Sequence, residues 1–157
     1  MIEQIYTFFN YEMIFLWINI GVIPFWLVLL FFSDSRICNF FVTSSFPYFI
    51  FGFIYIYLIY YFFINDYDFS QNFSLYLGLD ELKNLFTYKE FIISFWVHFL
   101  AINLFCGSWI VRDSKKFLIS KYLVFFPVIT TYFVGPLGLF FYWLIRIFYA
   151  KKISLYD

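Results

Sequence analysis

The sequence has few of the residues that hold metals or carry redox chemistry. Its 157 residues include one histidine, His98, and two cysteines, Cys38 and Cys106. Zinc and di-iron centres need clusters of His, Cys or carboxylate ligands, so neither kind of site is predicted. The six glycines form no phosphate-cradling loop or dinucleotide fingerprint, and no nucleophile elbow occurs. We therefore expect no metal and no cofactor.

Charged residues are also scarce. They make up 13% of the chain, against roughly 25% in an ordinary soluble domain. Ten basic and ten acidic residues cancel, and a chain without a basic excess is not expected to bind nucleic acid. Hydrophobic residues make up 64%, and a surface this apolar would aggregate in water. The composition predicts an integral membrane protein whose partner is the lipid bilayer.

Alanine is nearly absent, whereas phenylalanine occurs 28 times and tyrosine 15 times. Phe, Tyr and Ile have A/T-rich codons, so an A/T-rich genome that fills lipid-facing positions explains most of this excess. A pigment-binding aromatic box is the alternative interpretation. The coding bias fits a bacterium or an organelle, which favours a bacterial inner membrane or an organellar membrane.

Four long uncharged runs organise the chain. They are Met13–Ser33, Ile37–Asn65, Phe91–Val111 and Tyr122–Ile145. Each reaches the roughly 18–20 residues that a helix needs to cross a bilayer, and a helix satisfies its own backbone hydrogen bonds in lipid. The sequence therefore predicts an all-α integral membrane protein with one domain over residues 1–157 and four transmembrane helices over roughly 13–33, 44–64, 91–111 and 122–147.

The connection between the second and third spans, Asp66–Glu90, is the only long one. Leu75, Leu79, Leu82 and Phe86 recur there at helical spacing, with charged and amide residues between them. This pattern predicts a short amphipathic helix that lies in the membrane interface. A merely solvated loop is the alternative.

The basic residues do not settle the orientation of four alternating spans, because five fall on each side. No basic residue precedes Arg36, and four crowd the short connection between the third and fourth spans. Both facts favour cytoplasmic first and third connections, with both termini on the non-cytoplasmic side. The first span has no basic n-region, so it is expected to remain as an anchor rather than to be cleaved.

His98 lies inside one of the uncharged runs. An ionisable group is costly in hydrocarbon unless it is partnered, and it marks a functional position by default. His98 is also the only side chain here that titrates near neutral pH without perturbation. Two interpretations stay open: a hydrogen bond to another helix, or proton transfer or ligand binding. A transport pathway is less favoured, because four helices would form one only through oligomerisation.

Small residues and a proline predict how the third and fourth spans pack. Gly107 permits close approach of a neighbouring backbone, and Asn103 can donate a hydrogen bond across that contact. Pro136 has no N–H, so the carbonyl of Tyr132 is open to another donor. We expect the two spans to pack closely through Gly107, Gly135, Pro136 and Gly138.

Scattered polar, aromatic and small residues follow a fixed order between Phe86 and Arg146. They are Trp96-Val97-His98-Phe99-Leu100-Ala101-Ile102-Asn103-Leu104-Phe105, Gly107, Trp109, Asp113-Ser114, Gly135-Pro136-Leu137-Gly138-Leu139 and Arg146. In this order and spacing the chain resembles the abscisic-acid-deficient-four-like family, small four-helix membrane proteins whose plant members are linked to neoxanthin synthesis. The family usually has Asp where this chain has Asn103, which removes one carboxylate.

The resemblance implies a chemistry and a set of site residues. The linked plant step, violaxanthin to neoxanthin, isomerises an epoxide to an allenic alcohol without net redox change, so it needs a proton donor and a base. The implied protein is a cofactor-independent isomerase, or an obligatory helper, that acts on a carotenoid or other isoprenoid lipid. The implied proton-transfer residues are His98 and Asp113. The implied substrate-binding residues are Trp96, Asn103, Trp109, Arg112, Tyr142 and Arg146.

A second hypothesis is a non-catalytic membrane scaffold that binds a lipid or a partner protein. A substitution of His98 distinguishes the two hypotheses. If the protein is an isomerase, His98→Ala abolishes product formation while the protein still accumulates. If it is a scaffold, the same change matters only through stability.

Overall fold

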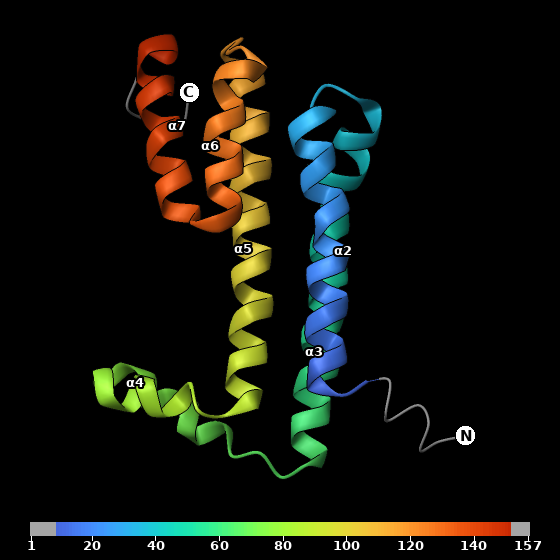
Figure 1. Ribbon diagram of the computed structural model, residues 1–157, viewed down its shortest axis with the longest axis vertical. Coiled ribbons are helices and arrows are strands. Elements are labelled where there is room, and N and C mark those ends of the chain that lie inside the picture. The colour runs from blue at the N-terminus through green and yellow to red at the C-terminus, as the bar shows by residue number, and fades with distance from the viewer. Residues whose placement is uncertain (1–8, 152–157) are drawn as a thin grey trace. The chain divides into compact units, whose positions relative to one another are not determined.

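A computed structural model of the protein describes residues 9–151, which are helical with no strand among them. Figure 1 shows the helices in chain order. The predicted all-α class is confirmed for this part of the chain. The helices are α2 (Tyr11–Phe31), the π-helical turn η1 (Cys38–Val42), α3 (Phe46–Ile64), the 3-10 helix η2 (Phe69–Tyr76), α4 (Leu79–Leu85), α5 (Lys89–Lys116), α6 (Lys121–Phe133) and α7 (Gly135–Ala150).

Three helical segments are long and apolar enough to cross a membrane. They are Tyr11–Phe31, Cys38–Ile64 and Lys89–Lys116. Most of their side chains are not buried within the protein, as expected of helices that face lipid. These segments coincide with the first three predicted spans.

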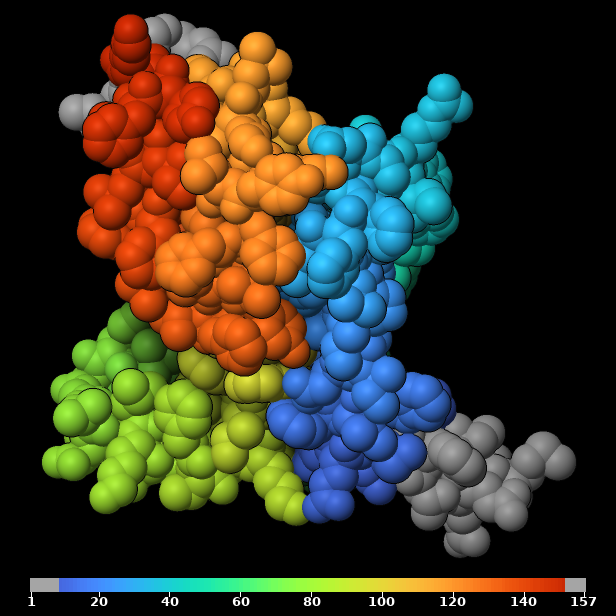
Figure 2. Space-filling view, turned by 45° about the horizontal axis from the view of Figure 1, so that its top comes forward, coloured from blue at the N-terminus to red at the C-terminus, as the bar shows by residue number. Residues whose placement is uncertain are grey.

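The fourth predicted span, residues 122–147, is two helices rather than one. Helix α6 ends at Phe133, and Val134 adopts an extended conformation with φ −143° and ψ 90°. Pro136 then occupies the first turn of α7, a position that suits proline because no intrahelical N–H donor is needed there. The two helices fold back on each other as a hairpin (Figure 1), and their side chains form one continuous surface (Figure 2).

The predicted amphipathic helix of the second connection is also divided. η2 and α4 pack together, and Leu77 and Gly78 separate them. Leu85 is buried, whereas Leu79 is 81% exposed. A location of this segment in the membrane interface stays a prediction.

The described residues form two compact units. The first holds residues 9–21 and 49–99, and the second holds residues 22–48 and 100–151. In the first unit, the Tyr11 hydroxyl donates to Glu90 Oε1 at 3.0 Å and Trp96 Nε1 donates to Asn19 Oδ1 at 3.1 Å. The predicted location of both chain ends concerns residues 1–8 and 152–157, which lie outside the described residues.

Candidate functional site

A buried ion pair joins α5 to α7 in the second unit. Arg146 Nε and the Tyr142 hydroxyl both donate to Asp113 Oδ2, each at 2.6 Å. Asp113 is 6% exposed, Tyr142 0% and Arg146 1%. Buried charges are tolerated only when they are paired and hydrogen-bonded, and here both conditions hold. We refer to Asp113, Tyr142 and Arg146 as the Asp113 cluster.

Aromatic rings enclose the Asp113 cluster. The Arg146 guanidinium lies 4.6 Å from the centre of the Phe117 ring and 5.0 Å from that of Trp143, within the range of cation–π attraction. Trp109 meets Tyr142 edge to face at 5.6 Å and stacks on Trp143 at 6.2 Å. Asp113 itself is buried, and its carboxylate already accepts two donors. These contacts suit a positioning role better than a direct exchange of protons with a ligand.

A groove of about 520 Å³ lies beside this cluster. Trp109 belongs to both, since its ring also lines the groove. The groove combines aromatic rings, hydroxyl groups, one amide and one guanidinium. Its lining residues are Asn39, Thr43, Ser44, Ser45, Tyr48, Phe105, Ser108, Trp109 and Arg112, and we call it the Arg112 groove.

Two features make the Arg112 groove suited to an amphiphile with an oxygenated head. The Tyr48 hydroxyl is buried beside the Ser108 hydroxyl, in a geometry too poor for a regular hydrogen bond between them, and buried polar groups ordinarily have a partner. Arg112 is exposed and offers several N–H donors to an oxygen acceptor. Tyr48 and Phe105 meet edge to face at 5.8 Å, which provides apolar wall for the rest of the molecule.

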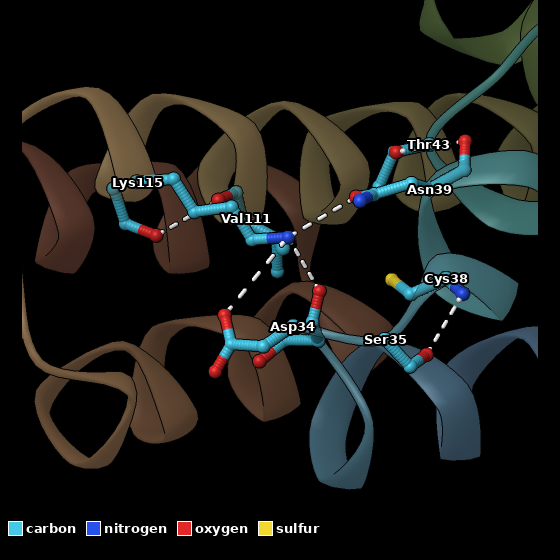
Figure 3. A network of polar contacts seen from close by, with 9 residues as sticks. Asp34, Ser35, Cys38, Asn39, Thr43, Val111 and Lys115 are labelled. Carbon is cyan, nitrogen blue, oxygen red and sulfur yellow. Dashed lines mark hydrogen bonds and ion pairs between the residues drawn. The ribbon is translucent and has the colours of Figure 1, made fainter.

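Lys115 holds the first connection, residues 32–45 between α2 and α3, against α5 (Figure 3). Its ammonium donates to the Ser33 carbonyl oxygen at 2.5 Å and to Asn39 Oδ1 at 3.2 Å, and lies 4.0 Å from Asp34 Oδ1. Ser108 Oγ adds a bond to the Val42 carbonyl oxygen at 3.2 Å. These bonds hold Asn39 and Val42 against α5, beside the Arg112 groove.

The glycines predicted to join the third and fourth spans have three different partners. A Cβ on Gly107 would lie 2.8 Å from the Trp26 ring of α2, whereas one on Gly138 would meet Thr131 within the α6–α7 hairpin. Only Gly135 faces α5, where a Cβ would meet Asn103 Oδ1. The packing of Gly107 and Gly138 therefore differs from the expected one.

The Tyr132 carbonyl, predicted to be open to another donor, accepts a hydrogen bond from α5. Asn103 is buried, and its Nδ2 donates to that carbonyl oxygen at 3.4 Å. The reason is broader than the missing N–H of Pro136, because α6 ends at Phe133 and its last carbonyls have no helical partners.

The structure gathers some of the predicted site residues. Trp109 and Arg112 line one groove, and Asp113, Tyr142 and Arg146 form the cluster beside it. His98 and Trp96 belong to the first unit. Trp96 is bonded to Asn19, whereas His98 is exposed and makes no hydrogen bond with the described part of the chain.

Several groove residues were missed by the sequence analysis. Asn39, Tyr48 and the run Thr43-Ser44-Ser45 come from the first connection and the start of α3. The signal that could have found them is this short polar run, which interrupts an otherwise apolar stretch. Among residues 9–151, no group of three His, Cys, Asp or Glu side chains could hold a metal ion.

Comparison with known proteins gives a family match over most of the chain. The family model described as ABA DEFICIENT 4-like matches residues 13–142. "Protein ABA DEFICIENT 4, chloroplastic" from Arabidopsis thaliana is 28% identical over 124 residues, which cover 73% of this chain and 56% of that relative. The match thus spans only a little over half the length of the relative. No solved structure matches.

Proposed function

This chain belongs to the ABA DEFICIENT 4-like family, and we propose that it binds an oxygenated isoprenoid lipid of the carotenoid class in a membrane and takes part in its processing. The resemblance to a family linked to neoxanthin synthesis supports the ligand class. The Arg112 groove is the observation that carries the proposal. The proposed location is a bacterial inner membrane or an organellar membrane.

The groove suits one end of such a lipid. A carotenoid is a long apolar chain with ring ends, and oxygen atoms on those rings need hydrogen bonds when they leave water. Arg112 and the Tyr48 hydroxyl can donate to such an oxygen, while Trp109 and Phe105 offer faces for the ring. The rest of the chain remains in the bilayer.

The chemistry we propose is an isomerisation without a cofactor. Opening an epoxide to an alcohol requires a proton donor for the epoxide oxygen and a base that removes a carbon-bound proton. His98 is the proposed proton carrier, as the family resemblance implies, because an imidazole can both donate and accept a proton. Asp113 is proposed as a positioning residue, since it orients Tyr142 behind Trp109.

Loss of groove side chains should release the ligand. Express the protein in a carotenoid-producing host, extract it in mild detergent, and measure bound polyene by absorbance and mass spectrometry. Trp109→Ala removes aromatic contact of about 1 to 1.5 kcal/mol, so we expect about a five- to tenfold loss of affinity. Arg112→Gln should weaken binding in the same direction.

Trp17→Ala is the matched control, because Trp17 is 61% exposed on α2 and lies outside the groove lining. It should retain the polyene. Clean absence of any polyene from the wild-type protein, or equal retention by all three variants, would contradict the proposal.

His98→Ala separates an enzyme from a scaffold. The exposed, unbonded imidazole contributes little to stability, so the variant should unfold within about 0.5 kcal/mol of wild type. Loss of a general acid or base lowers the rate by about 10²–10⁴-fold, so product per milligram of membrane protein should fall at least a hundredfold. Normal product with normal accumulation would favour the second candidate, a lipid-binding scaffold, which the closed environment of Asp113 also supports.

A further inference from the structure

The contacts of the α6–α7 hairpin define where its two ends and its turn lie along α5. Asn103 bonds the Tyr132 carbonyl, so the turn lies beside the middle of α5. Arg146 bonds Asp113, so the last turns of α7 lie beside the C-terminal end of α5. The chain thus runs back along α5 in α6 and returns in α7 (Figure 1).

Neither arm of the hairpin is long enough to cross a bilayer. Helix α6 has 13 residues and α7 has 16, which at 1.5 Å per residue gives about 20 and 24 Å against roughly 30 Å of hydrocarbon. The two arms together do not form one span either, because Val134 reverses the chain direction.

The turn has the hydrogen bonds that backbone needs inside a membrane. Non-helical backbone is tolerated at membrane depth only where protein groups satisfy it. The Val134 N–H donates to the Thr130 carbonyl at 2.8 Å, and the Val134 carbonyl accepts from the N–H groups of Leu137 and Gly138, both at 3.1 Å. Gly135 is buried, whereas the Val134 side chain is 47% exposed, so hydrogen bonds rather than burial satisfy the backbone of the turn.

We propose that α6 and α7 form a re-entrant hairpin, which enters the membrane from the side of residues 117–120, turns at Val134–Gly135, and leaves on the same side. With three spanning helices, Lys151 then lies on the same membrane face as Leu118. The four-span arrangement expected from hydropathy puts Lys151 on the opposite face, with Leu79.

With the re-entrant hairpin, the basic residues are no longer equally divided between the two sides of the membrane. Seven of the nine described Lys and Arg residues fall on the hairpin side, against Lys83 and Lys89 on the other. Such a bias assigns the hairpin side to the cytoplasm, where anionic headgroups attract basic side chains. The partner of this face is therefore the anionic leaflet of the bilayer. The seven residues are Arg36, Arg112, Lys115, Lys116, Lys121, Arg146 and Lys151.

Cysteine labelling tests the hairpin directly. In a Cys38→Ser, Cys106→Ser background, introduce one cysteine at a time by Leu79→Cys, Leu118→Cys or Lys151→Cys; Leu79 and Leu118 are 81% and 88% exposed. Treat intact cells and inside-out vesicles with a membrane-impermeant maleimide. We expect the cysteines at positions 118 and 151 to react only in inside-out vesicles and the one at 79 to react in intact cells. Joint labelling of positions 79 and 151 from one side would overturn the proposal.

A reporter on the otherwise unchanged chain guards against variants that fail to fold. Alkaline phosphatase fused to the C-terminus should be inactive in a bacterial host, and green fluorescent protein fused there should fluoresce. An active phosphatase fusion with a dark fluorescent fusion would overturn the inference. Both tests are independent of what the Arg112 groove binds.

Discussion

Arg146→Ala should lower the free energy of unfolding by about 3–5 kcal/mol, because it leaves the Asp113 carboxylate buried without its cation. The two residues are 1% and 6% exposed and share a 2.6 Å hydrogen bond. Water cannot replace the lost partner at a site enclosed by Phe117 and Trp143. Denaturant or thermal unfolding in detergent, followed by size-exclusion chromatography, measures the loss.

Two further variants show whether loss of the ion pair causes the lower stability of Arg146→Ala. Arg112→Gln removes the exposed neighbouring charge and should change stability by no more than about 0.5 kcal/mol. Replacing both partners, by Asp113→Leu with Arg146→Met, removes the unpaired charge and should recover part of the loss, because the buried Tyr142 hydroxyl still loses its acceptor. Wild-type stability of Arg146→Ala would show that the pair does not hold α7 on α5.

Gly138→Ala should destabilise the protein by about 1–3 kcal/mol through overpacking of the hairpin. A Cβ there would lie 2.5 Å from the Thr131 backbone nitrogen and 2.7 Å from the Pro127 carbonyl oxygen, and would also meet Thr131 Oγ1. Backbone atoms cannot move aside as a flexible side chain can, so α6 and α7 must separate. The same unfolding measurement reports the effect.

Gly52→Ala is the matched control for this change. Gly52 lies inside α3, and a Cβ there would meet nothing within 4 Å. Alanine favours a helix over glycine by up to about 1 kcal/mol, so this variant should be as stable as wild type or more so. A Gly138→Ala protein that behaves like Gly52→Ala would refute the tight packing of the hairpin.

Hydropathy located the first three long helices but not the hairpin. The run Tyr122–Ile145 is uncharged and long enough to span, and proline is tolerated within membrane helices. Nothing in that run distinguishes a kink at Pro136 from a reversal at Val134. At the reversal, Asn103 of α5 bonds the Tyr132 carbonyl at the end of α6 from a distant part of the sequence.

The residues of the candidate site also fall into a predicted group and a missed group. The sequence predicted Trp109, Arg112, Asp113, Tyr142 and Arg146 as site residues because they belong to the family's pattern, and the structure places them in or beside the Arg112 groove. Tyr48 and Asn39 were missed, because the first connection is drawn onto α5 through bonds such as that from Lys115 to the Ser33 carbonyl. Any residue type can supply a backbone carbonyl, so such bonds cannot be predicted from the sequence pattern.

The pair between Asp113 and Arg146 has a consequence for biosynthesis. The ribosome makes α5 before α7, so Asp113 enters the membrane with no cation available from this hairpin. Arg146 is synthesised after Asp113, so the 2.6 Å ion pair between them forms only once α7 has been made. The ion pair that joins α7 to α5 is therefore among the last contacts of the second unit to form.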